Sequence, residues 1–176
     1  MTTREPSQPN GTEPDPTESD PTEESHWRPL RLLLEAMDRD IASLYDERGV
    51  AGVRPRYVMP LVRLARRGPM SIRQLADSVD VTHSAMSQTV AAMRRDGLVR
   101  SVAGRADART REVAVTRKGR ALVPFMEAEW RATEAALAGL EREIPYPLTK
   151  VVRDVEQALS RRSFHDRVAE VLERDR

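Results

Sequence analysis

Residues 71–99 read SIRQLADSVDVTHSAMSQTVAAMRRDGLV, and this stretch decides the fold. Ser71 can cap the first turn of a helix while Gln74, three residues later, bonds back to it, which makes a capping box. Asp80 interrupts the helical pattern where a turn residue is needed, and Thr82 then offers a second N-cap hydroxyl. The stretch therefore predicts two short helices joined by a sharp turn.

The second of these helices is expected to run from about residue 83 to residue 96, because Gly97 stops it. Met86, Val90 and Met93 recur at i, i+4 and i+7, which places them on one stripe facing a core. If this helix stood alone, its opposite side would be interpreted as an ordinary solvated face. Its short polar residues also suit the major groove of DNA, where a Gln side chain can bond adenine. These outward residues are Ser84, Ser87, Gln88, Ala91, Arg94 and Arg95.

Two strand patterns follow, over residues 98–102 and 111–115, with a flexible tip between them. Nine basic and three acidic residues occur between Arg94 and Arg120, and phosphate binding requires such an excess of positive charge. At the tip, the carboxylate of Asp107 can hold the guanidinium of Arg109 in one orientation for a minor groove or a phosphate. Two helices, a turn and a basic hairpin in this order predict a winged helix-turn-helix.

Here the chain resembles the MarR family of bacterial regulators, named for multiple antibiotic resistance. The family's wing signature is Asp-x-Arg, then a strand that ends in Leu-Thr, then a Gly three residues on. Asp107, Arg109, Thr116 and Gly119 match it, and Val115 replaces the usual Leu. The resemblance covers roughly residues 28–160. It implies a mainly α fold with a small two-stranded β-wing, and a helical region through which two chains intertwine as a dimer.

The chain divides into four parts by composition and pattern. Residues 1–25 hold one basic and seven acidic residues and almost no apolar ones, which predicts disorder. Such a tail either competes weakly with DNA for the basic surface or only solubilises the protein, and the second alternative is favoured. The predicted parts are a disordered acidic tail (1–26), an N-terminal dimerisation helix (27–53), a winged helix-turn-helix DNA-binding domain (54–116) and C-terminal dimerisation helices (117–176).

The flanking helices are predicted from their apolar stripes. One runs from Pro29 to Gly49, and one from Arg54 to Arg66, in which Pro60 either kinks the helix or marks a misplaced boundary. A long helix follows the N-cap Thr116 and tolerates Pro124 in its early turns. Shorter helices are expected over residues 149–159 and 163–172. An isologous dimer would cover these stripes, whereas the alternative is that they pack within one chain.

Several classes of function are not supported by the residues. The chain has no cysteine, so disulfides, thiolate metal sites and a cysteine peroxide sensor are excluded. Its three histidines are isolated in sequence and predict no metal site, and no cofactor is expected. Catalytic motifs do not occur, so an enzyme is not expected. No apolar stretch is long enough for a membrane span and no signal segment opens the chain, which predicts a cytoplasmic protein.

The pattern and the resemblance together predict a homodimeric regulator, most often a repressor in this family, on an operator that is an inverted repeat. Its partners would be double-stranded DNA, a second copy of the chain and a small aromatic or anionic effector. The alternatives are a winged-helix protein-interaction module and an architectural DNA binder without sequence preference. The expected DNA-binding residues are Thr82, His83, Ser84, Ser87, Gln88, Arg94, Arg95, Arg105, Asp107, Arg109 and Arg111, and the expected effector-cleft residues are Trp27, Tyr57 and Met59.

Overall fold

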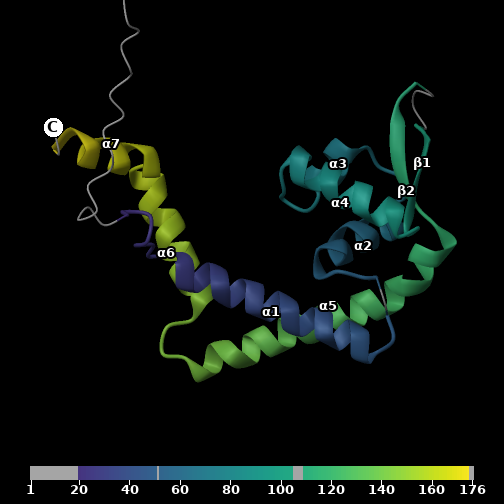
Figure 1. Cartoon of the computed structure of the whole chain (residues 1–176), viewed down its shortest axis with the longest axis horizontal. Coiled ribbons are helices and arrows are strands. Elements are labelled where there is room, and N and C mark those ends of the chain that lie inside the picture. The colour runs from purple at the N-terminus through teal and green to yellow at the C-terminus, as the bar shows by residue number, and fades with distance from the viewer. Residues whose placement is uncertain (1–19, 51, 105–108, 175–176) are drawn as a thin grey trace, which may run out of the picture. The chain divides into compact units, whose positions relative to one another are not determined.

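The computed structural model describes residues 20–50, 52–104 and 109–174, which fall into two units divided after Val53 (Figure 1). Among its described residues, the first unit contains one helix, α1 (Arg28–Glu47), which confirms the helix predicted between Pro29 and Gly49. The predicted disordered tail lies outside the described residues as far as residue 19. Residues 20–26 form turns, in which Asp20 accepts hydrogen bonds from the amide and hydroxyl of Thr22.

The second unit opens with a short 3₁₀ helix, η1 (Pro55–Tyr57), followed by α2 (Val58–Arg67). The single helix predicted over residues 54–66 is therefore wrong at its start, and Pro60 marks the misplaced boundary. Pro60 is the third residue of α2, where a backbone N–H has no partner within the helix, so its ring costs no hydrogen bond.

The two capped helices are confirmed as α3 (Ile72–Asp77) and α4 (His83–Arg95). The amide of Gln74 donates to Ser71 Oγ at 3.2 Å, and the amide of Ser71 donates to Gln74 Oε1 at 2.9 Å, which completes the capping box. Thr82 Oγ1 accepts from the amide of Ala85 at 3.2 Å. Asp80, with a φ of +55°, makes the turn between the helices.

The hairpin consists of β1 (Val99–Ala103) and β2 (Arg111–Val115), which pair antiparallel from Val99 opposite Val115 to Ala103 opposite Arg111. Met70, just before α3, exchanges two backbone hydrogen bonds with Val113, at 3.1 and 2.7 Å. The wing is thus tied by its backbone to the start of the helix pair.

In the described residues after the hairpin, three helices follow: α5 (Arg117–Glu143), α6 (Leu148–Arg161) and α7 (Phe164–Arg174). Thr116 caps α5 as predicted, but Pro124 does not lie in its early turns. It is the eighth helical residue, so its missing N–H deprives the carbonyl of Arg120 of its helical partner. The start of α6 is capped from the preceding helix, because the carboxylate of Glu141 accepts from the amide and hydroxyl of Thr149 at 2.7 and 2.9 Å.

The core of the second unit lies where α2 packs on α5, α3 packs on α4, and the hairpin packs on α2 and α4. In contrast, α6 and α7 contain no buried residue. In the described part of the chain, no helix has the length and apolar character needed to cross a membrane. The largest fully buried side chains of this core are Tyr57, Leu61, Leu64, Leu75, Met86, Met93, Leu98 and Met126.

Candidate nucleic-acid interface

Helix α4 has one buried and one exposed face, as the sequence predicted. Met86, Val90 and Met93 are between 0% and 3% exposed, so they fix the helix on the core. Ser84 and Gln88 are exposed on the other side and Ser87 is half-buried. The outward face therefore offers hydrogen-bonding groups on a helix that the core holds rigidly.

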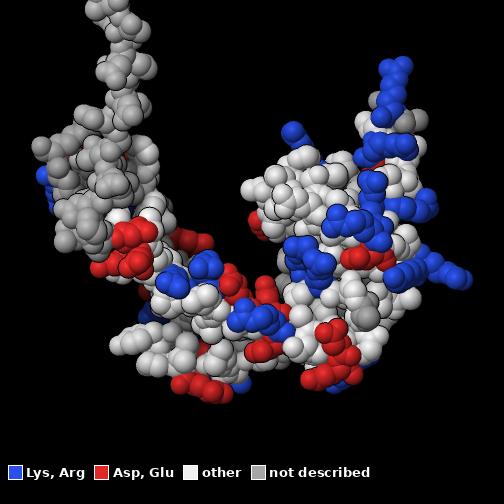
Figure 2. Space-filling model, viewed as in Figure 1, with Lys and Arg blue, Asp and Glu red and all other residues white. Residues whose placement is uncertain are grey.

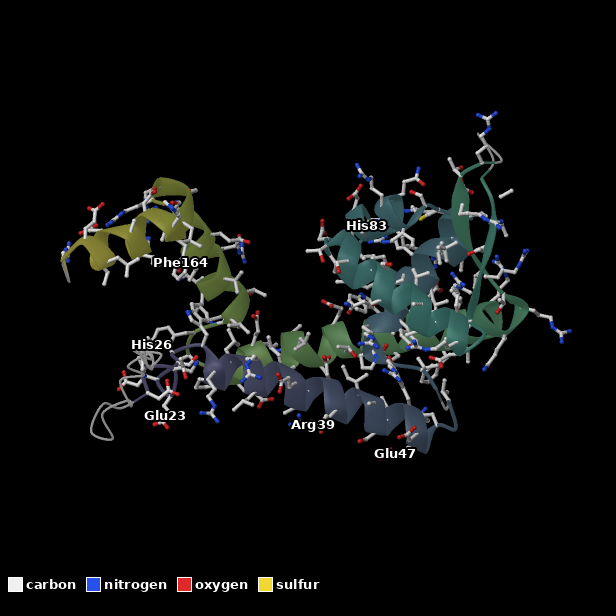
Figure 3. All side chains as sticks on the ribbon, turned by 45° about the horizontal axis from the view of Figure 1, so that its top comes forward. Glu23, His26, Arg39, Glu47, His83 and Phe164 are labelled. Atoms are coloured by element: carbon white, nitrogen blue, oxygen red, sulfur yellow. The ribbon has the colours of Figure 1, made fainter. Side chains whose placement is uncertain are left out.

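The start of α4 adds two of the predicted residues. Thr82 uses its hydroxyl oxygen to accept from the amide of Ala85, which leaves the hydroxyl proton available to an acceptor such as a phosphate. His83, the first helical residue, is exposed (Figure 3). Both side chains thus lie at the N-terminal end of the helix, where the backbone dipole favours an anion.

Basic side chains lie at the other end of α4 and on the hairpin, and Figure 2 shows them gathered over this part of the molecule. Arg94 and Arg95 are exposed, and with Ala91 they line a shallow, open hollow of about 400 Å³. Arg100 on β1 and Arg111 on β2 are exposed as well. In the part of the chain that the structure describes, these four arginines form no salt bridge. Arg100 and Arg111 lie on opposite faces of the hairpin, because Arg100 pairs with Ala114 and Arg111 with Ala103, and successive side chains alternate between faces. We call Arg94 and Arg95, at the end of α4, the basic face.

The tip of the wing carries three further predicted residues. Arg105 and Asp107 lie outside the described residues, so the pairing of Asp107 with Arg109 stays a prediction. Arg109 is described and exposed.

The junction between the end of α4 and the start of α5 is closely packed. The hydroxyl of Thr116 lies 2.7 Å from the carbonyl oxygen of Gly97 and 3.0 Å from that of Leu98, and shares its proton between them. The same hydroxyl oxygen accepts from the amide of Gly119 at 3.1 Å. A Cβ at Gly119 would lie 2.2 Å from the carbonyl oxygen of Leu98, so only glycine allows this approach. Thr116 and Gly119 thus join the start of α5 to the end of α4.

Asp96, the residue that ends α4, is held by two other elements. Tyr57 in η1 is fully buried, and its hydroxyl donates to Asp96 Oδ2 at 2.8 Å. Burial, and then the hydrogen bond to Asp96, raise the pKa of Tyr57 above that of a free tyrosine, so the hydroxyl remains a donor at neutral pH. Lys118 Nζ donates to the main-chain oxygen of Asp96 at 2.8 Å. The sequence reasoning missed this contact, since Tyr57 and Asp96 are 39 residues apart and no local pattern links them.

The residues expected to line an effector cleft have different surroundings. Trp27 is 62% exposed in the first unit, Met59 is half-buried in α2, and Tyr57 is part of the core of the second unit. Packing and the bond to Asp96 account for Tyr57 without a ligand. Among the described residues, no group of three or more carboxylate and histidine side chains is placed to hold a metal ion.

Two short capped helices, a polar and basic outer surface on the second, and a two-stranded hairpin define a winged helix-turn-helix protein. A family model described as the MarR family matches residues 51–110. A MarR family transcriptional regulator from Silicibacter pomeroyi is 31% identical in sequence, with 93% of its length and 74% of this chain covered, at a TM-score of 0.47. The protein therefore belongs to the MarR family of DNA-binding transcriptional regulators, which confirms the predicted family and fold class.

Two other solved structures share the fold at lower identity. MepR from S. aureus, determined as a DNA complex, is 14% identical and has a TM-score of 0.58, with 77% of this chain and 96% of that chain covered. BpsR from Bordetella bronchiseptica, studied for regulation of its DNA binding by 6-hydroxynicotinic acid, is 20% identical and has a TM-score of 0.51, with 73% and 90% covered. A search of curated proteins finds no match for the chain.

Proposed function

We propose that this protein is a sequence-specific regulator that binds a palindromic operator as a homodimer and represses transcription by occluding a promoter. The observation that carries the proposal is the exposed face of α4, whose polar residues stand between the helix N-terminus and the basic face. Helix α4 is 13 residues long and suits the major groove of DNA, which admits an α-helix. Because such a regulator acts on the chromosome, we place the protein in the cytoplasm.

Each part of this surface has a separate role in the proposal. Ser84, Ser87 and Gln88 read base edges, since short polar and amide side chains make the hydrogen bonds that distinguish base pairs. Thr82, His83 and the basic face contact phosphates, which fix the register of the helix and carry no sequence information. The wing, with Arg105 and with Arg109 held by Asp107, adds a contact beside the helix, in the minor groove or on a phosphate.

Selection of bound duplexes from a random pool tests the function directly. A sharp inverted repeat with half-sites roughly 10 base pairs apart, centre to centre, is the expected result, because two symmetry-related helices would enter successive major grooves. A shallow preference would favour an architectural DNA binder. Failure to bind any duplex at low salt would contradict the proposal and favour a protein-interaction module.

The dimer is supported by the apolar residues that α6 and α7 leave exposed. A large apolar surface of this kind on a single chain marks an interface, and a two-fold dimer buries the same patch on both copies. We therefore assign residues 27–53 and 117–176 to dimerisation and residues 54–116 to DNA binding. The exposed apolar residues of α6 and α7 are Leu148, Val151, Val152, Leu159, Phe164, Val168, Val171 and Leu172.

Val152→Glu should convert the dimer into a monomer, because it places a charge on an apolar surface that association would bury. Val152 is 47% exposed, so the change costs little within one chain. Gln157→Glu, at an exposed polar position of the same helix, adds the same charge as a control. Sedimentation at micromolar concentration should show a dimer for the wild type and for Gln157→Glu. A monomeric wild type, or a Val152→Glu variant that stays dimeric, would argue against this interface.

Gln88→Ala should cost about 1 to 3 kcal/mol of binding free energy at one base position in each half-site, because a single amide reads a single base pair. The measurement compares affinities for the selected duplex and for its single-base variants. Gln157→Ala, outside the proposed interface, should leave every affinity unchanged. A loss that is equal for all the duplexes would show that Gln88 does not read bases.

Regulation by a small molecule is part of the proposal. A small aromatic or anionic effector would favour a spacing of the two α4 helices in the dimer that misses successive grooves. The known regulation of BpsR by 6-hydroxynicotinic acid, a small aromatic acid, supports this class of effector. The corresponding measurement is a titration of the protein–DNA complex with such acids, in which the dissociation of the DNA is recorded.

A further inference from the structure

The three residues that directly follow α4 are held by side chains from other elements. Asp96, Gly97 and Leu98 accept hydrogen bonds at three main-chain oxygens and one carboxylate oxygen. Thr116 and Lys118, at the start of α5, provide the main-chain contacts. The contact to the carboxylate of Asp96 comes instead from Tyr57 in η1.

That contact is made by the hydroxyl of Tyr57. Its ring is fully buried in the core, and its oxygen lies 2.8 Å from Asp96 Oδ2. A hydrogen bond to a charged acceptor in a partly buried place is stronger than one between neutral groups. Since the ring is packed in the core, its hydroxyl is a fixed donor to Asp96, the C-cap residue of α4.

We propose that Tyr57 is a positioning residue for sequence reading: through Asp96, its hydroxyl fixes the tilt of α4 at which Gln88 and the two serines meet base edges. This inference rests on the proposed role of α4. Hydrogen bonds to base edges require a placement within about 0.5 Å and 10 to 20°, whereas contacts between arginines and phosphates are largely insensitive to such shifts.

A packing role alone would have a different consequence. Partial loss of folded protein lowers the affinity for every duplex by the same factor, because only the active fraction changes. Loss of positioning lowers the affinity for the selected duplex and leaves the affinity for a scrambled duplex unchanged. The ratio of the two affinities therefore separates the two roles.

The experiment uses the full-length protein, the duplex selected from the random pool and a scrambled duplex of the same length and composition. Tyr57→Phe removes the hydroxyl and keeps the ring in the core. Tyr146→Phe removes the hydroxyl of a tyrosine that is 78% exposed, and serves as the matched control. Asp96→Asn keeps a side-chain oxygen that accepts from Tyr57, whereas Asp96→Ala removes it, so this second pair tests the same bond from its other end.

For Tyr57→Phe and for Asp96→Ala, the affinity ratio should fall about tenfold, which is the discrimination that one well-placed base contact provides. The salt dependence of binding to the scrambled duplex should stay the same, since no phosphate contact is lost. Tyr146→Phe should match the wild type, and Asp96→Asn should keep most of the ratio. A ratio that stays within about twofold of the wild type in both Tyr57→Phe and Asp96→Ala would overturn the proposal, as would equal losses on both duplexes. If the wild type selects no sequence at all, it is the proposed function that fails.

Discussion

Gly119→Ala is expected to lower the free energy of unfolding by about 3 kcal/mol or more, which is the largest stability effect of a single methyl group that we foresee in this chain. The added Cβ would lie 2.2 Å from the carbonyl oxygen of Leu98 and 2.9 Å from Val115 Cγ2. A backbone carbonyl cannot rotate away as a flexible side chain does. The junction must therefore open, which strains the hydrogen bonds of Thr116 to Gly97 and Leu98.

Thermal unfolding followed by circular dichroism measures this loss, and a fall in Tm of roughly 10 °C is expected for a chain of this size. Gly139→Ala is the matched control, because Gly139 lies in the same helix and its added Cβ would meet only the end of Arg142 at 3.7 Å. This variant should gain about 1 kcal/mol, as alanine is the better helix former. A Gly119→Ala variant as stable as the wild type would mean that α5 does not approach Leu98 so closely.

The double variant Arg94→Ala, Arg95→Ala should weaken DNA binding by on the order of 100-fold at about 0.1 M salt. Both side chains are exposed at the end of α4 and belong to the basic face, and a dimer loses both from each copy. The slope of log affinity against log salt should fall by about 2 for each protomer, since fewer counterions are released. Fluorescence anisotropy titrations at a series of salt concentrations give both quantities.

The control for this variant removes the same charge from another surface. Arg131 and Arg142 are exposed on α5 outside the proposed DNA contact, so their double replacement by alanine should leave the slope unchanged. If both double variants changed the slope equally, net charge rather than the basic face would govern binding. An unchanged slope in Arg94→Ala, Arg95→Ala would remove these arginines from the DNA contact.

The local elements of the winged helix-turn-helix could be predicted closely from the sequence. The capping box at Ser71, the N-cap at Thr82 and the turn at Asp80 each depend on atoms within a few residues of one another. The hairpin could be predicted for the same reason, because alternating residues and a short connection favour pairing between neighbouring strands. The prolines were predicted less well. The position of Pro60 or Pro124 along a helix depends on where that helix begins, and propensity locates such boundaries poorly.

The face of α4 that is proposed to read DNA could also be found from the sequence, because the helical repeat separates Met86 and Val90 from Gln88 once one side is known to be buried. The contacts that hold the end of that helix could not be predicted from the sequence. The bond from Tyr57 to Asp96 joins residues far apart in the chain, and the approach of Gly119 to Leu98 depends on how two helices meet across the wing. The sequence by itself thus determined the elements and their polar and apolar faces, because these depend on short-range periodicity and capping. Only the tertiary structure decided which distant side chains hold the end of α4 in place, because contacts between remote segments form when the core packs.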